Sequence, residues 1–225
     1  MLENLNQPRR YDVVLGGKAP PPLSGAVLGG LAGVKHRLKS HVAQYRLAAL
    51  TEALNYKDAG FELVIQALDD EVEQVRDTAC ILLQGKLAKL TLLKTDAATW
   101  NKWREHSIRL EEGVNVNLSG LNLGGFNLSG FNLSSVNLIG ANLCGAKLMG
   151  ANLWGANLSE VNLKEADLSE ANLTAALLYK ANLAGANLTD ANLMGANLQR
   201  ANLNGSNVEG ATFQRAIMPD GIIHD

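Results

Sequence analysis

The sequence has 225 residues and is 47% hydrophobic but only 5% aromatic, which allows one large or two small domains with aliphatic cores. Its 20 Lys and Arg nearly balance its 22 Asp and Glu, giving a net charge of −2. This balance disfavours a strongly basic nucleic-acid binder and a strongly acidic polyanion. Two cysteines do not make a disulfide framework. No apolar run reaches the roughly 18 residues of a membrane span, and Met1-Leu2-Glu3 is not the start of a signal peptide. We therefore expect a cytoplasmic protein.

The N-terminal part divides into an arm and a helical region. Residues 1–25 lack periodicity, and the prolines at 20–22 favour an extended, Pro/Gly-rich arm. Residues 26–95 are rich in helix formers, and two stretches match at an offset of 30, with Val42 and Ala49 corresponding to Val72 and Ala79. The match predicts a repeated helix–turn–helix unit. It resembles a HEAT repeat, in which an acidic N-cap, here Asp69-Asp70, begins a helix whose Val75 and Ala79 pack inward.

Residues 96–114 are expected to form a capping and connecting segment, with a helix over roughly residues 97–110 that carries Trp100, Trp103 and Ile108. Large aromatic residues at helical spacing usually belong to a core. We interpret this apolar face as a cap on the first turn of the segment that follows.

Residues 115–225 are expected to form one domain with a C-terminal cap, and from Val116 the chain has a five-residue period that fits neither a helix nor a flat strand. Twenty consecutive units span 116–215, with Leu at 18 of the central positions, Asn before it in 16 units and Ala before that in 13. Ala and Leu, two positions apart, point the same way along an extended step, and this way must be inward. Gly closes 11 units and suits a tight corner. Four corners close one square coil, so the units predict about five coils.

The repeated Ala-Asn-Leu-x-Gly unit resembles the pentapeptide repeat family, which is common in cyanobacteria. The resemblance implies a right-handed quadrilateral β-helix, a β-solenoid preceded here by a small all-α domain. The segment from Ala216 to Gly221 is similar to the closing segment of some cyanobacterial members, and Pro219 is expected to stop the ladder.

The sequence offers little that indicates catalysis. The four histidines have no metal-ligand spacing with Cys, Asp or Glu. Cys144, in an outward position, has no histidine near it in the repeat that could act as a base. We predict no catalytic residue, no metal site and no cofactor, and hence no enzyme.

The most informative deviations are apolar residues at outward positions of the repeat. Equivalent positions in successive coils stack in one column, so Trp154 and Met194 share a column with Thr174, and Ile139 and Tyr179 share the next. Met149 lies in a third. These five residues are a candidate partner-binding surface, although single apolar residues on a surface also need no explanation.

Three classes of function are open. The first is a non-catalytic protein–protein interaction or scaffold protein, with an unknown protein partner or a second copy as in a homodimer, and with no nucleic acid and no membrane. The second is a DNA mimic that regulates gyrase or topoisomerase. It is disfavoured because the rod carries six acidic against five basic residues, whereas duplex DNA presents a charge about every 1.7 Å. The third is a lyase-like helper of chromophore attachment.

Overall fold

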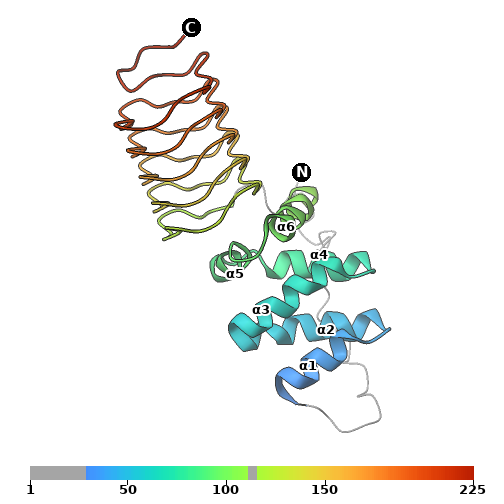
Figure 1. Cartoon of the computed structure of the whole chain (residues 1–225). Helices are drawn as coiled ribbons and strands as arrows, with labels where there is room; N and C mark the ends of the chain where they lie inside the picture. The colour runs from blue at the N-terminus through green and yellow to red at the C-terminus, as the bar shows by residue number, and fades with distance from the viewer. Residues whose placement is uncertain (1–28, 111–115) are drawn as a thin grey trace, which may run out of the picture.

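A stack of short helices leads into a straight rod of stacked coils (Figure 1). The computed structural model describes residues 29–110 and 116–225, apart from the side chains of Lys86 and Leu87. The 3₁₀ turns η1 (Leu54–Tyr56) and η2 (Ala67–Asp69) lie among the helices. The helices are α1 (Gly30–Leu38), α2 (Ala43–Ala53), α3 (Lys57–Gln66), α4 (Glu73–Leu82), α5 (Lys86–Leu92) and α6 (Ala97–Arg109). The predicted arm at residues 1–25 lies outside the described residues.

The helical region contains the repeated unit that the sequence predicts. Helices α2 and α4 begin at Ala43 and Glu73, which correspond to each other in the repeat. At the same offset, Arg46 donates to the carbonyl of Ser40 at 2.6 Å, and Arg76 to the carbonyl of Asp70 at 2.7 Å. Equivalent contacts at equivalent positions show that the helix–turn–helix unit is repeated. Its HEAT-like character stays a prediction.

The start of α4 differs in detail from the expected acidic N-cap. The N-cap residue is Val72, and Asp70, two positions earlier, accepts the backbone N–H of Val72 at 2.9 Å. Asp70 also forms an ion pair with the buried Arg46, whose Nε lies 2.8 Å from the carboxylate. The acidic residue thus ties two units together, because burying the Arg46 charge requires a partner. Val75 and Ala79 are buried as predicted.

The rod is a right-handed quadrilateral β-helix of five coils. Each central backbone step pairs in parallel with the equivalent step of the next coil, from Asn117 with Asn137 to Asn197 with Ile217. Every central Leu from Leu118 to Leu198 is buried in the interior. The partner position is buried in most units and is mostly Ala, because a narrow interior has no space for two large side chains at each corner.

Two local features turn each corner. The fifth residue of all 20 units has a positive φ, as in a type II turn: 11 are Gly, and the others include Ala175 at 55° and Glu160 at 57°. The middle Asn also accepts, through Oδ1, the N–H of the residue two positions later, as Asn157 does from Ser159 at 3.1 Å. The five-residue period therefore places one turn in every unit, with a short extended step between successive turns.

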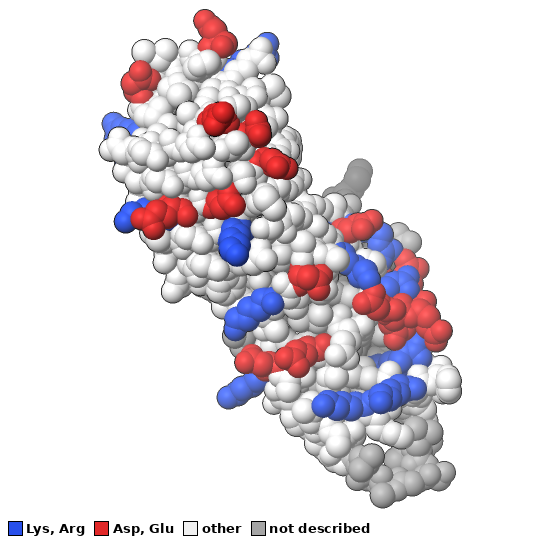
Figure 2. Space-filling model, viewed as in Figure 1, with Lys and Arg blue, Asp and Glu red and all other residues white. Residues whose placement is uncertain are grey.

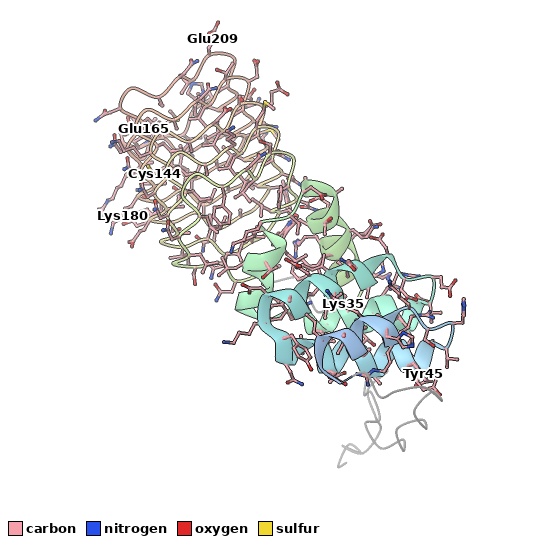
Figure 3. The ribbon with its side chains drawn as sticks, turned by 60° about the horizontal axis from the view of Figure 1, so that its bottom comes forward. Lys35, Tyr45, Cys144, Glu165, Lys180 and Glu209 are labelled. Atoms are coloured by element: carbon pink, nitrogen blue, oxygen red, sulfur yellow. The ribbon has the colours of Figure 1, made fainter. Side chains whose placement is uncertain are left out.

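The parallel ladder ends at the unit that contains Pro219, as predicted, but the proline itself takes part in the ladder. Residues 216–220 form one more unit, and the Pro219 carbonyl accepts the N–H of Arg200 at 2.9 Å. The chain then folds back, with Ile217 pairing antiparallel with Ile223. Proline fits here because this last unit needs its carbonyl but not an N–H. Glu209 lies at this end, away from the helices (Figure 3).

Helix α6 covers the first coil, and its bounds agree with the helix expected over roughly residues 97–110. It ends at Arg109, and residues 111–115 lie outside the described part of the chain. Trp100 packs against Phe131, with ring centroids 5.9 Å apart, and Trp103 packs on Trp100 at 5.1 Å. Ile108 is 45% exposed and does not belong to the cap, because it lies on the face of α6 that points to solvent.

Candidate functional site

The rod has four sides, named here by their units in the first coil: side A starts at 116–120, side B at 121–125, side C at 126–130 and side D at 131–135. Each side continues with the equivalent unit of every following coil. Trp154 and Met194 lie in one column at the corner between sides D and A, since Gly155 donates to the carbonyl of Thr174 and Ala175 to that of Met194. The side chains of Trp154 and Met194 are 51% and 40% exposed.

The sequence reasoning missed a third apolar residue beside this column. Leu177 stands at the middle position of side A, where Asn157 and Asn197 pair with it from the coils below and above, and it is 43% exposed. Along the axis of the rod, Leu177 lies between Trp154 and Met194. The signal was present in the sequence, because Leu177 is the one apolar residue at a position that is Asn in 16 of 20 units. Trp154, Leu177 and Met194 are called the apolar patch below.

Two other predicted residues border side A at its opposite corner. Ile139 is exposed, two coils below Tyr179 in one column. Tyr179 is only half-buried rather than free on the surface, because Lys180 and Arg200 lie over its ring at 5.3 and 5.9 Å from the centroid. The corner therefore gives the patch a cationic and aromatic border.

Met149 does not join the others. It lies at the corner between sides C and D, and so it faces away from side A although it is 49% exposed. The structure thus brings four of the five predicted residues around one side and separates the fifth.

Titratable groups and cysteines are the side chains that could bind a metal or take part in catalysis. Within residues 29–110 and 116–225 no three His, Cys, Asp or Glu side chains gather as a metal site. Cys144 is half-buried at an outward position of the rod (Figure 3). Cys80 is buried against Ser107, with its Sγ 3.1 Å from the hydroxyl. Burial, and next the charge of Arg104, lowers the pKa of Lys89, which lies over the Trp103 ring in the core.

Charge on the rod is sparse and of both signs (Figure 2). Glu160 pairs with Lys180 at 3.5 Å and Glu165 with Lys164 at 3.3 Å. Asp167 lies within the ladder on side C, where hydrogen bonds from Ser169 lower the pKa of its carboxyl. Acidic residues this sparse, two of them paired with lysines, do not reproduce the dense negative field of duplex DNA.

Comparison with known proteins supports the repeat assignment. A family described as pentapeptide repeats matches eight copies over residues 114–149, 146–183 and 176–215. The chain belongs to the pentapeptide repeat family. Proteins of this family are generally structural or interaction proteins. Among curated proteins, none matches this pentapeptide repeat chain significantly.

Three solved structures are similar to part of this chain. HetL, a pentapeptide repeat protein involved in heterocyst differentiation regulation in the cyanobacterium Nostoc sp. strain PCC 7120, is 39% identical over 50% of this chain and 54% of HetL, with a TM-score of 0.47. Rfr23 from the cyanobacterium Cyanothece 51142 is 33% identical over 48% of this chain and 91% of Rfr23, with a TM-score of 0.39. QnrB1, a plasmid-mediated fluoroquinolone resistance protein, is 19% identical over 46% of this chain and 65% of QnrB1, with a TM-score of 0.33. This chain thus spans about half the length of HetL.

No helix within residues 29–110 or 116–225 has the length and apolar character needed to cross a bilayer.

Proposed function

We propose that this pentapeptide repeat protein is a non-catalytic interaction protein and that a protein partner binds the apolar patch formed by Trp154, Leu177 and Met194. The observation that carries the proposal is Leu177. A residue at this position is normally Asn, and the fold gains from Asn in a way that it cannot gain from Leu.

Leu177 lacks a hydrogen bond that Asn makes at the same position in other units. Asn157 and Asn197, on either side in the same column, accept the N–H of Ser159 at 3.1 Å and of Gln199 at 3.0 Å. Leu177 has no acceptor for the equivalent N–H of Tyr179, which has no hydrogen-bond partner in the described residues. A hydrogen bond of this kind stabilises by about 0.5–1.5 kcal/mol. An exposed Leu therefore weakens the rod locally, and partner binding supplies a reason for its presence.

The surroundings of Leu177 fit a protein surface better than a small ligand. The corner beside it carries Gly155, Ala175 and Gly195, which have no side chain or only a methyl group. Trp is among the residues most often found at the energetic centre of protein interfaces. Lys180 and Arg200 at the opposite corner form a polar rim and favour a partner with acidic residues at the edge of its contact.

Leu177→Asn is the test that separates binding from folding. The substitution restores the residue of the repeat, so we expect unchanged or slightly higher stability in urea unfolding together with loss of the partner. The full chain, the Leu177→Asn variant and the equally exposed control Met149→Ser would be immobilised and used for affinity capture with quantitative mass spectrometry, followed by titration of the captured protein. Light scattering would detect a second copy of this chain as the partner.

Two results would contradict the proposal. One is capture of the same proteins, at the same levels, by the full chain and by Leu177→Asn. The other is loss of the partner from Met149→Ser as well, because that residue faces another side of the rod.

A further inference from the structure

The first coil of the rod has an open lower edge. In every higher coil, the backbone of the middle residue bonds the coil beneath: the N–H of Asn137 donates to the carbonyl of Val116 at 2.9 Å, and its carbonyl accepts the N–H of Leu118 at 2.8 Å. Residues 116–135 have no coil beneath them. Their downward groups must pair with other parts of the chain, with water or with a ligand.

Helix α6 satisfies this edge on side D with side chains in place of a strand. Asn101 accepts the N–H of Asn132 at 2.6 Å, Trp100 donates to the Asn132 carbonyl at 2.8 Å, and Arg104 donates to the Ser134 carbonyl at 2.9 Å. These are the three backbone groups that a lower coil would bond. The edge on side D is therefore complete.

The adjoining edge on side C is not complete. The N–H and carbonyl of Asn127 and the carbonyl of Ser129 have no hydrogen-bond partner in residues 29–110 and 116–225. The Asn127 amide accepts the Ser129 N–H through Oδ1 at 3.3 Å, which leaves its Nδ2 donor free among the same residues. Three backbone groups at ladder spacing and one side-chain donor thus point the same way.

These groups line a cleft between the rod and the loop that joins α5 to α6. The cleft has a volume of about 680 Å³ and takes its apolar wall from Leu93, Phe126 and Phe131. This volume is in the range of ligand-binding clefts. Lys94 also lines it, is exposed and forms no ion pair in the described residues. Asp96 instead uses its carboxylate as the N-cap of α6, where it accepts the N–H of Thr99 at 2.9 Å.

We propose that this cleft binds an extended acidic segment of a partner protein, which adds one strand beneath residues 126–130. The middle residue of the added strand is Asp, and the backbone groups on either side of this Asp pair with Asn127 and Ser129. The residue before the Asp is small and apolar and lies under Phe126. β-Strand addition to an exposed edge is a recurrent mode of peptide recognition.

The choice of Asp rests on a precedent in the same column and on charge. Higher on side C, the Nδ2 of Asn187 donates to the carboxylate of Asp167 at 3.1 Å, one coil below it. Asn127 offers the same donor to whatever lies below it. Lys94 places an ammonium group at the cleft beside the Asp96 carboxylate, and this ammonium group can pair with an acidic side chain of the segment.

The probe is the peptide acetyl-Glu-Ala-Asp-Leu-Ser-amide, which copies residues 165–169. Titration into the full-length protein would be followed by the amide NMR signals and by hydrogen exchange. We expect saturable binding, shifts confined to residues around 94–97 and 126–131, and slower exchange of the Asn127 N–H. Asn127→Asp keeps the acceptor for Ser129 but replaces Nδ2 with a carboxylate, so it should weaken binding at least about tenfold, as expected for a lost hydrogen bond to a charged group. Lys94→Gln should weaken it less, because the pair is exposed.

The matched controls are Asn207→Asp, in the same column at the far end of the rod, and Lys39→Gln, another exposed lysine. Both should bind as the unaltered protein does, and a peptide with Asn in place of Asp should regain binding to Asn127→Asp. The proposal is overturned if the peptide does not saturate, if its shifts map elsewhere, or if Asn127→Asp binds normally. It is also overturned if the Asn127 N–H is already protected before peptide is added, since the edge would then be occupied by the chain itself.

Discussion

Asn101 is the side chain by which α6 most directly replaces a missing coil. It accepts the N–H of Asn132 at 2.6 Å and donates to the carbonyl of Gly130 at 3.0 Å. Asn101→Ala removes both bonds. Each is worth about 0.5–1.5 kcal/mol, and water reaches the exposed Gly130, so we expect a loss of about 1–2 kcal/mol between α6 and the rod.

Hydrogen exchange can measure this loss of stability at the backbone group that Asn101 contacts. Hydrogen exchange of the Asn132 N–H should become about 5–30-fold faster, the ratio that corresponds to 1–2 kcal/mol, while amides in the coils above keep their protection. Urea unfolding gives the global effect. Asn204→Ala is the control, because Asn204 is exposed and its side chain makes no hydrogen bond within residues 29–110 and 116–225. Equal exchange of the Asn132 N–H in Asn101→Ala and in Asn204→Ala would refute the view that α6 substitutes for a coil.

Three further substitutions test the rod. Leu158→Ala should destabilise the rod by about 2–5 kcal/mol in urea unfolding, because it empties a fully buried position. Leu177→Ala, at a half-exposed position, is its control. Similar losses of unfolding free energy in both variants would contradict a packed interior at Leu158. Ala175→Gly should stabilise the rod by about 0.5–1 kcal/mol in thermal unfolding, because Ala175 has a φ of +55°. A left-handed backbone conformation costs a non-glycine residue more than Gly loses in conformational entropy. Unchanged stability of the variant would show that the corner is unstrained. Asp167→Asn should make stability less sensitive to acid. The pKa of Asp167 is lowered in the folded protein, first by the Ser169 hydroxyl. Its contribution to stability is therefore present above the ordinary pKa of 3.8 and is lost as the pH falls through the pKa of the folded state. Parallel curves of stability against pH for both proteins, from pH 5 to about pH 2, would disprove this assignment.

The amino-acid sequence alone is enough to predict the architecture of the rod. A five-residue period with Leu inward, Asn beside it and Gly at the corner constrains every unit in the same way, so local rules repeated along the rod leave one architecture. The internal match between the two helical stretches likewise determined the two helical units, because Val75 and Ala79 follow the apolar period of a helix.

The surface and the two ends of the rod could not be predicted from the repeat and depend on the folded chain. Outward positions obey no packing rule, so the sequence named Trp154 and Met194 but passed over Leu177, whose neighbours one coil away become visible only when the coils stack. The two ends depend on contacts between distant segments: Asn101 completes side D and leaves side C open, and Pro219 joins the ladder because its carbonyl, which has no sequence signature, meets Arg200. Periodicity encodes the interior of a solenoid, whereas its surface and its ends are set by long-range contacts.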